Sequence, residues 1–155
     1  MTDDSLAYVG LTRLHAAYAD AVTRRAWDEL EPLFVPAAPI HVDTVTRPVI
    51  ELVGATELGR FIDESIARFE FFEFVVLNLV ARIAPDRTAR GRLYMVELRQ
   101  TRESAAWSNA YGVYQDDYVL HDDQWRFAER HYQSLARKIG TDPAEVFPFA
   151  VARTL

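Results

Sequence analysis

Residues Ala110–Tyr132, AYGVYQDDYVLHDDQWRFAERHY, decide the fold that we expect for this chain. The stretch alternates as two strands do, and the polar residues 121–124 (HDDQ) interrupt it as a turn does. A turn of two or of four residues gives the same register, with Leu120 opposite Trp125. Counting back from this pair predicts three more cross-strand pairs: Tyr118–Phe127, Asp116–Glu129 and Tyr114–His131.

The predicted hairpin places phenols, carboxylates and an imidazole on one face, among large apolar side chains. A strand that faces water does not need this mixture, and a core does not tolerate polar groups unless they are paired. The wall of a small-molecule pocket uses both kinds of side chain. The stretch therefore predicts a pocket that is lined by the sheet.

The rest of the chain predicts helices first and long strands later. Apolar residues at spacings of three and four indicate helices, and alternating or continuous apolar residues indicate strands. The expected helices are 6–25, 27–34 and 57–69, and the expected strands are 40–46, 49–53, 70–83, 89–102, 107–120 and 125–135. This order predicts the α+β class, with three helices packed in the concave face of a strongly curved, mainly antiparallel mixed sheet.

Turns at 86–87 and 104–105 extend the register to two more strands. They predict four pairs: Val76–Glu97, Asn78–Met95, Met95–Tyr114 and Glu97–Gly112. The helix-facing side of the sheet then holds Phe74, Val76, Asn78, Leu93, Met95, Glu97, Gly112, Tyr114, Asp116, Tyr118, Trp125, Phe127, Glu129 and His131. The outer side holds Val75, Leu77, Leu79, Tyr94, Val96, Leu98, Tyr111, Val113 and Val119. Because so apolar a face is unusual on a monomer, we expect a homodimer through it.

Composition narrows the kinds of protein that the chain can be. The 155 residues suit one domain, 1–155, with enough apolar residues for a core. A net charge of −6 argues against a nucleic-acid partner, because phosphate binding needs a basic face. There is no cysteine, so thiol chemistry and cysteine-based metal sites are excluded. Since we find neither a signal-peptide pattern nor a bilayer-spanning apolar run, we expect a soluble cytoplasmic protein without a membrane partner.

Several short segments together resemble one known family. They are 18–22 (YADAV), 27–30 (WDEL) with 33–34 (LF), Gly54, Asn78, 112–116 (GVYQD), and 125–127 (WRF) with Arg130. Their order and spacing resemble the SnoaL-like branch of the NTF2-like superfamily. The resemblance covers about residues 8–136 and leaves 137–155 as a C-terminal tail.

This resemblance implies a cystatin-like cone, in which helices and a strongly bent sheet enclose a deep apolar pocket. Members include polyketide cyclases, scytalone-type dehydratases, limonene-type epoxide hydrolases and ketosteroid isomerases, and others bind or assemble without catalysis. The chain departs from the family at two positions. Many members carry an aspartate where this chain has Thr23, and dehydratase-like members carry a histidine where it has Phe74.

The predicted catalytic residues are His131, Tyr114 and Asp116. An imidazole suits proton transfer near neutral pH, so His131 is the expected general acid or base. Tyr114 could donate a hydrogen bond to a carbonyl or oxyanion of the substrate. Asp116 could act as a base or orient His131. Each of the three also fits a purely structural role, as a hydrogen-bonded side chain of the sheet.

The same face and the elements beside it supply the expected substrate contacts. These are Tyr18, Trp27, His41, Asp43, Phe74, Asn78, Met95, Glu97 and Phe127. For Glu97, burial would raise the pKa of the carboxyl. The side chains of His41, Asp43 and His131 could also form a facial metal triad, but no supporting motif spacing is present. We therefore expect no bound metal and no cofactor.

Two functions remain open at this point. The first is a cofactor-independent acid–base enzyme, a dehydratase, cyclase or isomerase, that acts on a hydrophobic polyketide-, steroid- or aromatic-like small molecule. The polar cluster on an aromatic-lined face favours it. The second is a non-catalytic ligand-binding or dimerisation module of the same fold. Thr23 and Phe74, at the family's usual aspartate and histidine positions, favour this alternative.

Overall fold

Helices form in the first half of the chain and long strands in the second, as predicted. The computed structural model describes residues 3–148 and Leu155. The helical elements are α1 (Asp3–Arg24), the 3-10 helix η1 (Trp27–Leu33) and α2 (Gly54–Ile66). The strands are β1 (Pro39–Asp43), β2 (Ile50–Val53), β3 (Phe69–Ile83), β4 (Thr88–Thr101), β5 (Trp107–His121), β6 (Gln124–Ile139) and β7 (Glu145–Val146).

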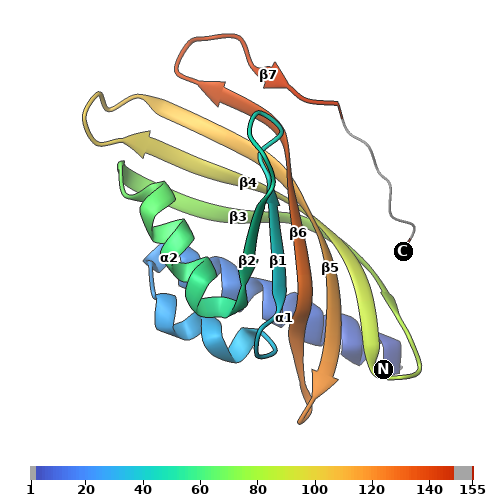
Figure 1. Cartoon of the computed structure of the whole chain (residues 1–155). Coiled ribbons are helices and arrows are strands. Elements are labelled where there is room, and N and C mark those ends of the chain that lie inside the picture. Colours follow the sequence, from blue (N-terminus) through green and yellow to red (C-terminus); the bar gives the residue numbers. More distant parts are fainter. Residues whose placement is uncertain (1–2, 149–154) are drawn as a thin grey trace.

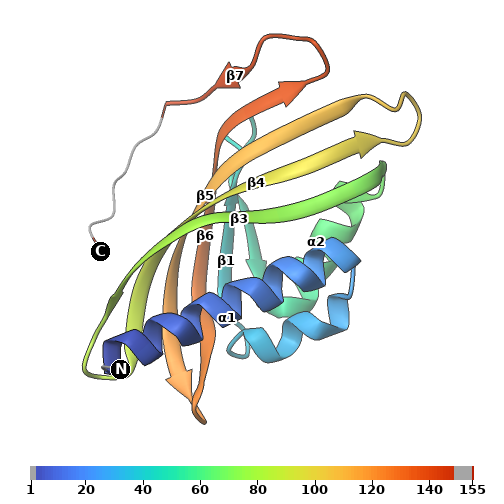
Figure 2. The same cartoon turned by 180° about the vertical axis from the view of Figure 1, so that it is seen from behind.

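The strands form one sheet that curves around the helices (Figures 1 and 2). Its order is β2-β1-β6-β5-β4-β3, with β7 paired to β6. β1 runs parallel to β6, and the other pairs are antiparallel. α1 crosses the concave side, while η1 and α2 lie beside it on the same side (Figure 2). The predicted α+β cone is therefore confirmed.

The core forms where the apolar side of α1 meets the concave side of the sheet. Leu11, Leu14 and Tyr18 recur at helical spacing and are all buried. The ring of Tyr18 meets those of Phe34 and Phe127 edge-on, at centroid distances of 6.3 and 5.8 Å. This geometry is typical of aromatic pairs in cores. α1 is therefore held to the sheet by one continuous apolar stripe.

The predicted register of the β5–β6 hairpin is correct near the turn and wrong beyond a β-bulge. Leu120 pairs with Trp125 and Tyr118 with Phe127, as expected. Between these pairs and the next one, Ala128 has no partner on β5. One extra residue moves every later side chain of the strand to the opposite face. As a result Asp116 pairs with Arg130 and Tyr114 with Tyr132, instead of with Glu129 and His131.

The other two predicted registers are also shifted. On the β4–β5 pair, Glu97 lies opposite Ala110, two residues from the prediction, so its face is unchanged. On β3, a bulge at Leu77 pairs Asn78 with Tyr94. The predicted inward position of Asn78 is therefore wrong: it is exposed on the outer side. The same bulge turns Leu79 inward, opposite Leu93.

Element boundaries differ from the prediction by up to three residues in α1, β1 and α2 and by more at the end of β6, and the helix expected at 27–34 is the 3-10 helix η1. Pro32 lies inside η1 and lacks the amide hydrogen that an α-helix needs, which suits a short 3-10 helix. β6 runs to Ile139, and β7 then pairs with it, so that Phe147 is buried on the same sheet. The apolar residues Val146, Phe147 and Phe149 predict that the tail packs on its own domain or on a partner, and of these Phe149 lies outside the described residues. Among the described residues, no helix is long and apolar enough to cross a membrane.

Candidate functional site

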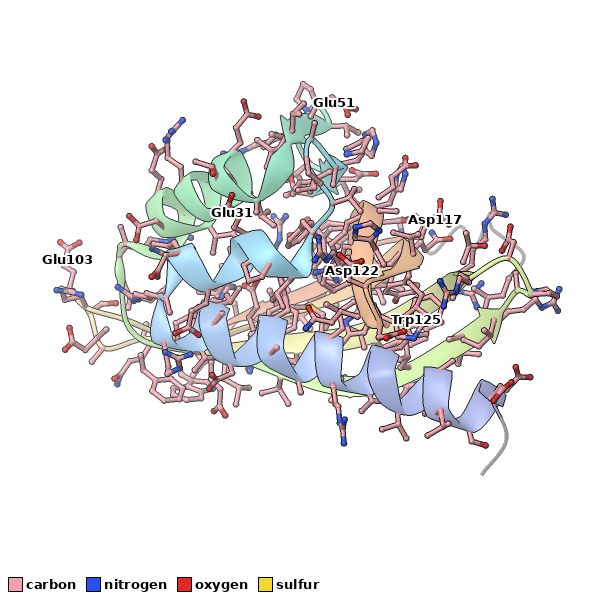
Figure 3. The ribbon with its side chains drawn as sticks, turned by 90° about the horizontal axis from the view of Figure 1, so that it is seen from below. Glu31, Glu51, Glu103, Asp117, Asp122 and Trp125 are labelled. Atoms are coloured by element: carbon pink, nitrogen blue, oxygen red, sulfur yellow. The ribbon has the colours of Figure 1, made fainter. Side chains whose placement is uncertain are left out.

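A cavity of about 630 Å³ lies between α2 and the concave side of the sheet. Its walls come from α1, α2 and the halves of β3–β6 that lie near α2. The cavity lies toward the end of the sheet that holds the β4–β5 turn, where Figure 3 labels Glu103. Trp125, also labelled there, marks the opposite end, where β6 meets α1. The volume suits a drug-sized small molecule.

Small residues on β5 make room for the cavity. Glu97, Ala110 and Arg137 form one row across β4, β5 and β6, and the short Ala110 leaves space between the two charged side chains. In the next row, a Cβ on Gly112 would lie 2.2 Å from the ring of Tyr132. Only glycine therefore lets this ring lie across β5. Burial raises the pKa of Tyr132 to about 12, so its phenol stays a neutral hydrogen-bond donor.

Glu97, on β4, places a carboxylate on the part of the cavity wall that the sheet forms. Its side chain is 23% exposed, and it lines the cavity. Burial raises the pKa of Glu97, while Arg99 and Arg137 pull it down less strongly. The hydrogen bond from Arg99 Nη1 to Glu97 Oε2 is long, at 3.4 Å. The carboxylate is thus weakly paired, which suits a group that exchanges protons.

The raised pKa of Glu97 predicts how stability depends on pH. Below the ordinary glutamate value of 4.5, the carboxyl is protonated in both the folded and unfolded states. Between that value and the raised folded value, the folded state binds the proton more tightly, so the free energy of unfolding falls as pH rises. We expect Glu97→Gln to be more stable than the wild type above this window.

Denaturant unfolding between about pH 4 and pH 8 checks this expectation, because the stability difference should close at the acid end. Glu103→Gln is the matched control, since its side chain lies in the exposed β4–β5 turn. A stability difference that does not change with pH, or that grows towards acid, would contradict a raised pKa at Glu97.

Arg130 is fully buried beneath the cavity and is held by Asp116. Its Nε donates to Asp116 Oδ1 at 2.8 Å, and its Nη2 donates to Oδ2 at 3.1 Å. The guanidinium carbon also lies 4.4, 3.9 and 4.0 Å from the ring centroids of Tyr18, Tyr114 and Phe127. A bidentate carboxylate and three aromatic faces fix the cation in one position.

One nitrogen of Arg130 is not used by Asp116. Its Nη1 is buried, and no hydrogen-bond partner for it occurs within residues 3–148 and Leu155. Arg130 is also one of the residues that line the cavity. A buried donor of a charged group is costly to leave unpaired. Arg130 is therefore a fixed cation at the cavity wall with one donor that is unpaired in the described part of the chain.

A second chain of hydrogen bonds supports Asp116 from the side of α1. Burial and the nearby Arg130 lower the pKa of His15 well below its ordinary value, so the imidazole is neutral. Its Nε2 lies 2.7 Å from the hydroxyl of Tyr118, which in turn donates to Asp116 at 3.3 Å. In the neutral tautomer with a proton on Nε2, His15 donates to Tyr118 and Tyr118 donates to Asp116, while His15 Nδ1 has no partner among the described residues. The sequence alone suggests a surface residue at His15, and this prediction is wrong: His15 is buried and helps to hold Arg130.

Charge in the cavity is opposite in sign to the charge of the whole chain. Five arginines and two glutamates line it: Arg47, Arg68, Arg99, Arg130, Arg137, Glu64 and Glu97. The whole chain carries a net charge of −6. A cationic cavity in an anionic protein attracts small anions and raises their local concentration. The geometry thus favours a ligand with an apolar body and a negative group.

The family can be assigned from the match to a known domain. A SnoaL-like domain model matches residues 3–131. The chain belongs to the SnoaL-like family. No curated protein sequence matches this SnoaL-like domain significantly.

Solved structures with the same fold share little sequence with this SnoaL-like domain. A candidate scytalone dehydratase from Novosphingobium aromaticivorans is 20% identical over 100% of both chains, with a TM-score of 0.77. A hexachlorocyclohexane dehydrochlorinase from Novosphingobium barchaimii is 16% identical over 94% of this chain and 98% of the other, with a TM-score of 0.77. A protein of unknown function from Mycobacterium tuberculosis is 21% identical over 85% and 73%, with a TM-score of 0.72. At these identities the likeness establishes the fold.

Some of the residues predicted for the site lie on the cavity of the SnoaL-like domain. They are Tyr18, Phe74, Glu97 and Tyr114. The others lie elsewhere. Met95 and Phe127 are buried in the core, Asp116 is buried under Arg130, and Trp27 donates to Asp63 on α2. Asn78 and His131 are on the outer side of the sheet with His41, and Asp43 accepts a hydrogen bond from the amide of Val45.

The prediction that His131 faces the pocket is wrong, and the bulge at Ala128 is the reason. Arg130 and Tyr132 take the inward positions that the simple register gave to Glu129 and His131. Sequence reasoning thus missed Arg130 and Tyr132, and it also missed Arg99 and Arg137. Phe127 and Tyr132 are both large apolar residues, but they lie five positions apart, so they would face opposite sides of a regular strand. This spacing was the signal in the sequence for a bulge between them.

The two departures from the family pattern are in direct contact. The amide of Phe74 donates to Thr23 Oγ1 at 3.0 Å. The positions of the family's usual aspartate and histidine therefore lie side by side here, joined by a hydrogen bond that carries no titratable group. Neither Thr23 nor Phe74 has a side chain that exchanges protons near neutral pH.

Proposed function

We propose that this SnoaL-like protein is a cofactor-independent lyase or isomerase that binds an amphipathic, anionic small molecule in the cavity. Glu97 is the general base of this proposal. The observation that carries it is a weakly paired carboxylate with a raised pKa on the wall of a cationic cavity. Carboxylates tuned in this way are typical of enzymes that move protons near neutral pH.

The proposed reaction starts with removal of a proton from a carbon next to a carboxylate or carbonyl. Glu97 takes the proton, and the C–H electron pair becomes part of an enolate. In a lyase the pair then forms a C=C bond as a hydroxyl leaves the neighbouring carbon, and Glu97 gives its proton to that hydroxyl, which departs as water. In an isomerase Glu97 returns the proton to a different carbon. Neither route needs an oxidant, a reductant or another co-reactant.

The other polar groups of the cavity have roles that follow from their charge. Arg130 Nη1 and the neutral phenols of Tyr114 and Tyr132 are donors for the oxygen that becomes negative. Arg99 and Arg137 keep part of the Glu97 population ionised, because both lower its pKa. Phe72 and Phe74 supply the apolar wall for the body of the substrate.

The comparisons agree with an elimination. The names dehydratase and dehydrochlorinase both describe removal of a small molecule across a carbon–carbon bond. Polyketide-, steroid- and aromatic-like bodies all remain candidates for the apolar part of the substrate. The anionic group narrows the class to acids such as hydroxy acids with an aromatic or alicyclic body.

A non-catalytic binding module is the second candidate. The contact between Thr23 and Phe74 favours it, because the family's usual acid–base pair is absent there. In that case the arginines would bind the same class of anion without turnover. The outer homodimer and the cytoplasmic location also stay predictions.

An exchange experiment distinguishes the two candidates. The full-length protein is incubated in D₂O with a panel of 3-hydroxy and 3,4-unsaturated carboxylic acids that carry aromatic or alicyclic groups. NMR then follows deuterium at carbon 2 and loss of water. We expect deuterium incorporation above the buffer rate for at least one acid, and slower reaction of the matching primary amide, which lacks the charge.

Binding of the same acids is measured in parallel by their effect on the melting temperature. If acids raise the melting temperature but none of them exchanges hydrogen or loses water, the protein is a binding module and the proposed enzyme is rejected. Amides that bind and react as well as their acids would contradict the anionic substrate class.

A further inference from the structure

Two histidines and two glutamates form a cluster on the outer side of the sheet. His41 and His131 are direct partners in the parallel β1–β6 pair, and their rings stack with centroids 4.1 Å apart. Glu129 precedes His131 by two residues on β6 and so shares its face. Glu51 is the cross-strand partner of His41 on β2, at the hairpin edge where Figure 3 labels it. Three neighbouring strands therefore supply one cluster.

The contacts within the cluster leave the lone pair of His41 Nε2 next to the carboxylate of Glu129. His41 Nδ1 contacts Glu51, so in the neutral imidazole Nδ1 carries the proton and Nε2 has none. Nε2 lies 3.3 Å from Glu129 Oε1 and, although buried, has no hydrogen-bond partner in the part of the chain that the structure describes. His131 Nε2 lies 2.6 Å from the same oxygen. Two nitrogens and one oxygen thus converge on one point.

We propose that His41, Glu129 and His131 bind a divalent transition-metal ion such as zinc. One ligand atom of each side chain lies within 4.8 Å of the others. Zinc holds such atoms at about 2.0–2.2 Å each, so the two stacked imidazoles must tilt toward each other for all three atoms to bond the ion. The side chains are 24%, 33% and 34% exposed, which leaves the remaining positions on the ion to water.

The surroundings suit a cation. Strand alternation puts residues two apart on one face, and a neighbouring strand adds the third ligand without any turn or loop. Two carboxylates, Glu51 and Glu129, lie beside two imidazoles. The Glu51 carboxylate on His41 Nδ1 is the outer partner that fixes the ring for a metal at Nε2.

This ligand set differs from both expectations of the sequence. The only triad that the sequence suggested used Asp43, and we expected no metal. In the structure the carboxylate of the cluster comes from Glu129 instead of Asp43. The bulge at Ala128 is the reason, because it moves both Glu129 and His131 to the outer side. Asp43 instead accepts from the amide of Val45 at 2.8 Å. The site is separate from the cavity, whose lining includes none of these residues.

Zinc binding to the untagged full-length protein tests the proposal. The protein is dialysed against a chelator, zinc alone is added, and native mass spectrometry and calorimetry give the stoichiometry and Kd. We expect one ion per chain and a higher melting temperature with zinc, because the ion joins β1 to β6. His131→Ala and Glu129→Gln should each weaken binding at least tenfold, and Glu51→Gln by roughly 10- to 100-fold.

Two control variants sharpen the result. Asp43→Asn removes the carboxylate of the rejected triad, and His121→Ala removes an exposed histidine of the β5–β6 turn. Both should bind zinc as the wild type does, and circular dichroism should show that all metal-free variants are folded. Failure of the wild type to retain zinc, unchanged binding by His131→Ala, or loss of binding only in Asp43→Asn would each overturn the proposal.

Discussion

Replacing Asp116 by alanine is expected to lower the free energy of unfolding by about 3–5 kcal/mol, because it leaves the buried Arg130 without a counter-ion. For a domain of this size, such a loss lowers the melting temperature by roughly 6–20 °C. Both side chains of the pair are fully buried, so water cannot replace the lost carboxylate. Thermal melting followed by circular dichroism measures the effect.

Asp117 provides a matched control one residue away. It lies on the other face of β5 and pairs with the exposed Arg90, so Asp117→Ala should cost about 1 kcal/mol or less. The double variant Asp116→Leu/Arg130→Met should lose less stability than the sum of the two single losses, since no charge is left buried alone. Equal effects of Asp116→Ala and Asp117→Ala would show that the buried pair does not hold the fold together.

In the proposed reaction, replacing Glu97 by glutamine is expected to lower turnover by roughly 100- to 10,000-fold, the usual contribution of a general base. Glutamine keeps the shape of the side chain and cannot accept the proton. Because the folded protein holds the ionised form of Glu97 at a cost, the same variant should be more stable than the wild type near neutral pH. Activity and stability should thus change in opposite directions.

The measurement is the rate of deuterium exchange or water loss, with binding of the acid followed separately. Glu97→Gln should still bind the acid, because the arginines of the cavity are unchanged. Glu103→Gln, in the exposed turn, should react at the wild-type rate. A Glu97→Gln variant that turns over within about twofold of the wild type would remove Glu97 from the mechanism, since the loss of a base costs far more.

Most of the fold followed from local patterns. Apolar spacing predicted α1, α2 and the long strands, because each of these elements buries one face. The turn at 121–124 also predicted the two pairs nearest to it. Information of this kind is short-ranged, since a turn sets the register only until the first bulge.

The candidate site was predicted only in part for the same reason. Glu97 and Tyr114 were expected on the inner side and line the cavity there. A two-residue error between β4 and β5 did no harm to this prediction, because side chains alternate with a period of two. A one-residue bulge at Ala128 was enough to exchange His131 for Arg130. The ion pair between Asp116 and Arg130 depends on that exchange and so could not be foreseen.

Ala128 also decides which of two sets of residues β6 offers to each side of the protein. With the extra residue, Arg130 and Tyr132 face the cavity, and Glu129 and His131 face outward. Loss of a single residue at this point would exchange the sets. The imidazole of His131 would then face the pocket, as the register without a bulge predicts. Relatives that differ by one such residue could therefore have nearly the same letters in this strand and quite different chemistry. Within this family, a gap in an alignment at β6 deserves as much weight as a change of amino acid.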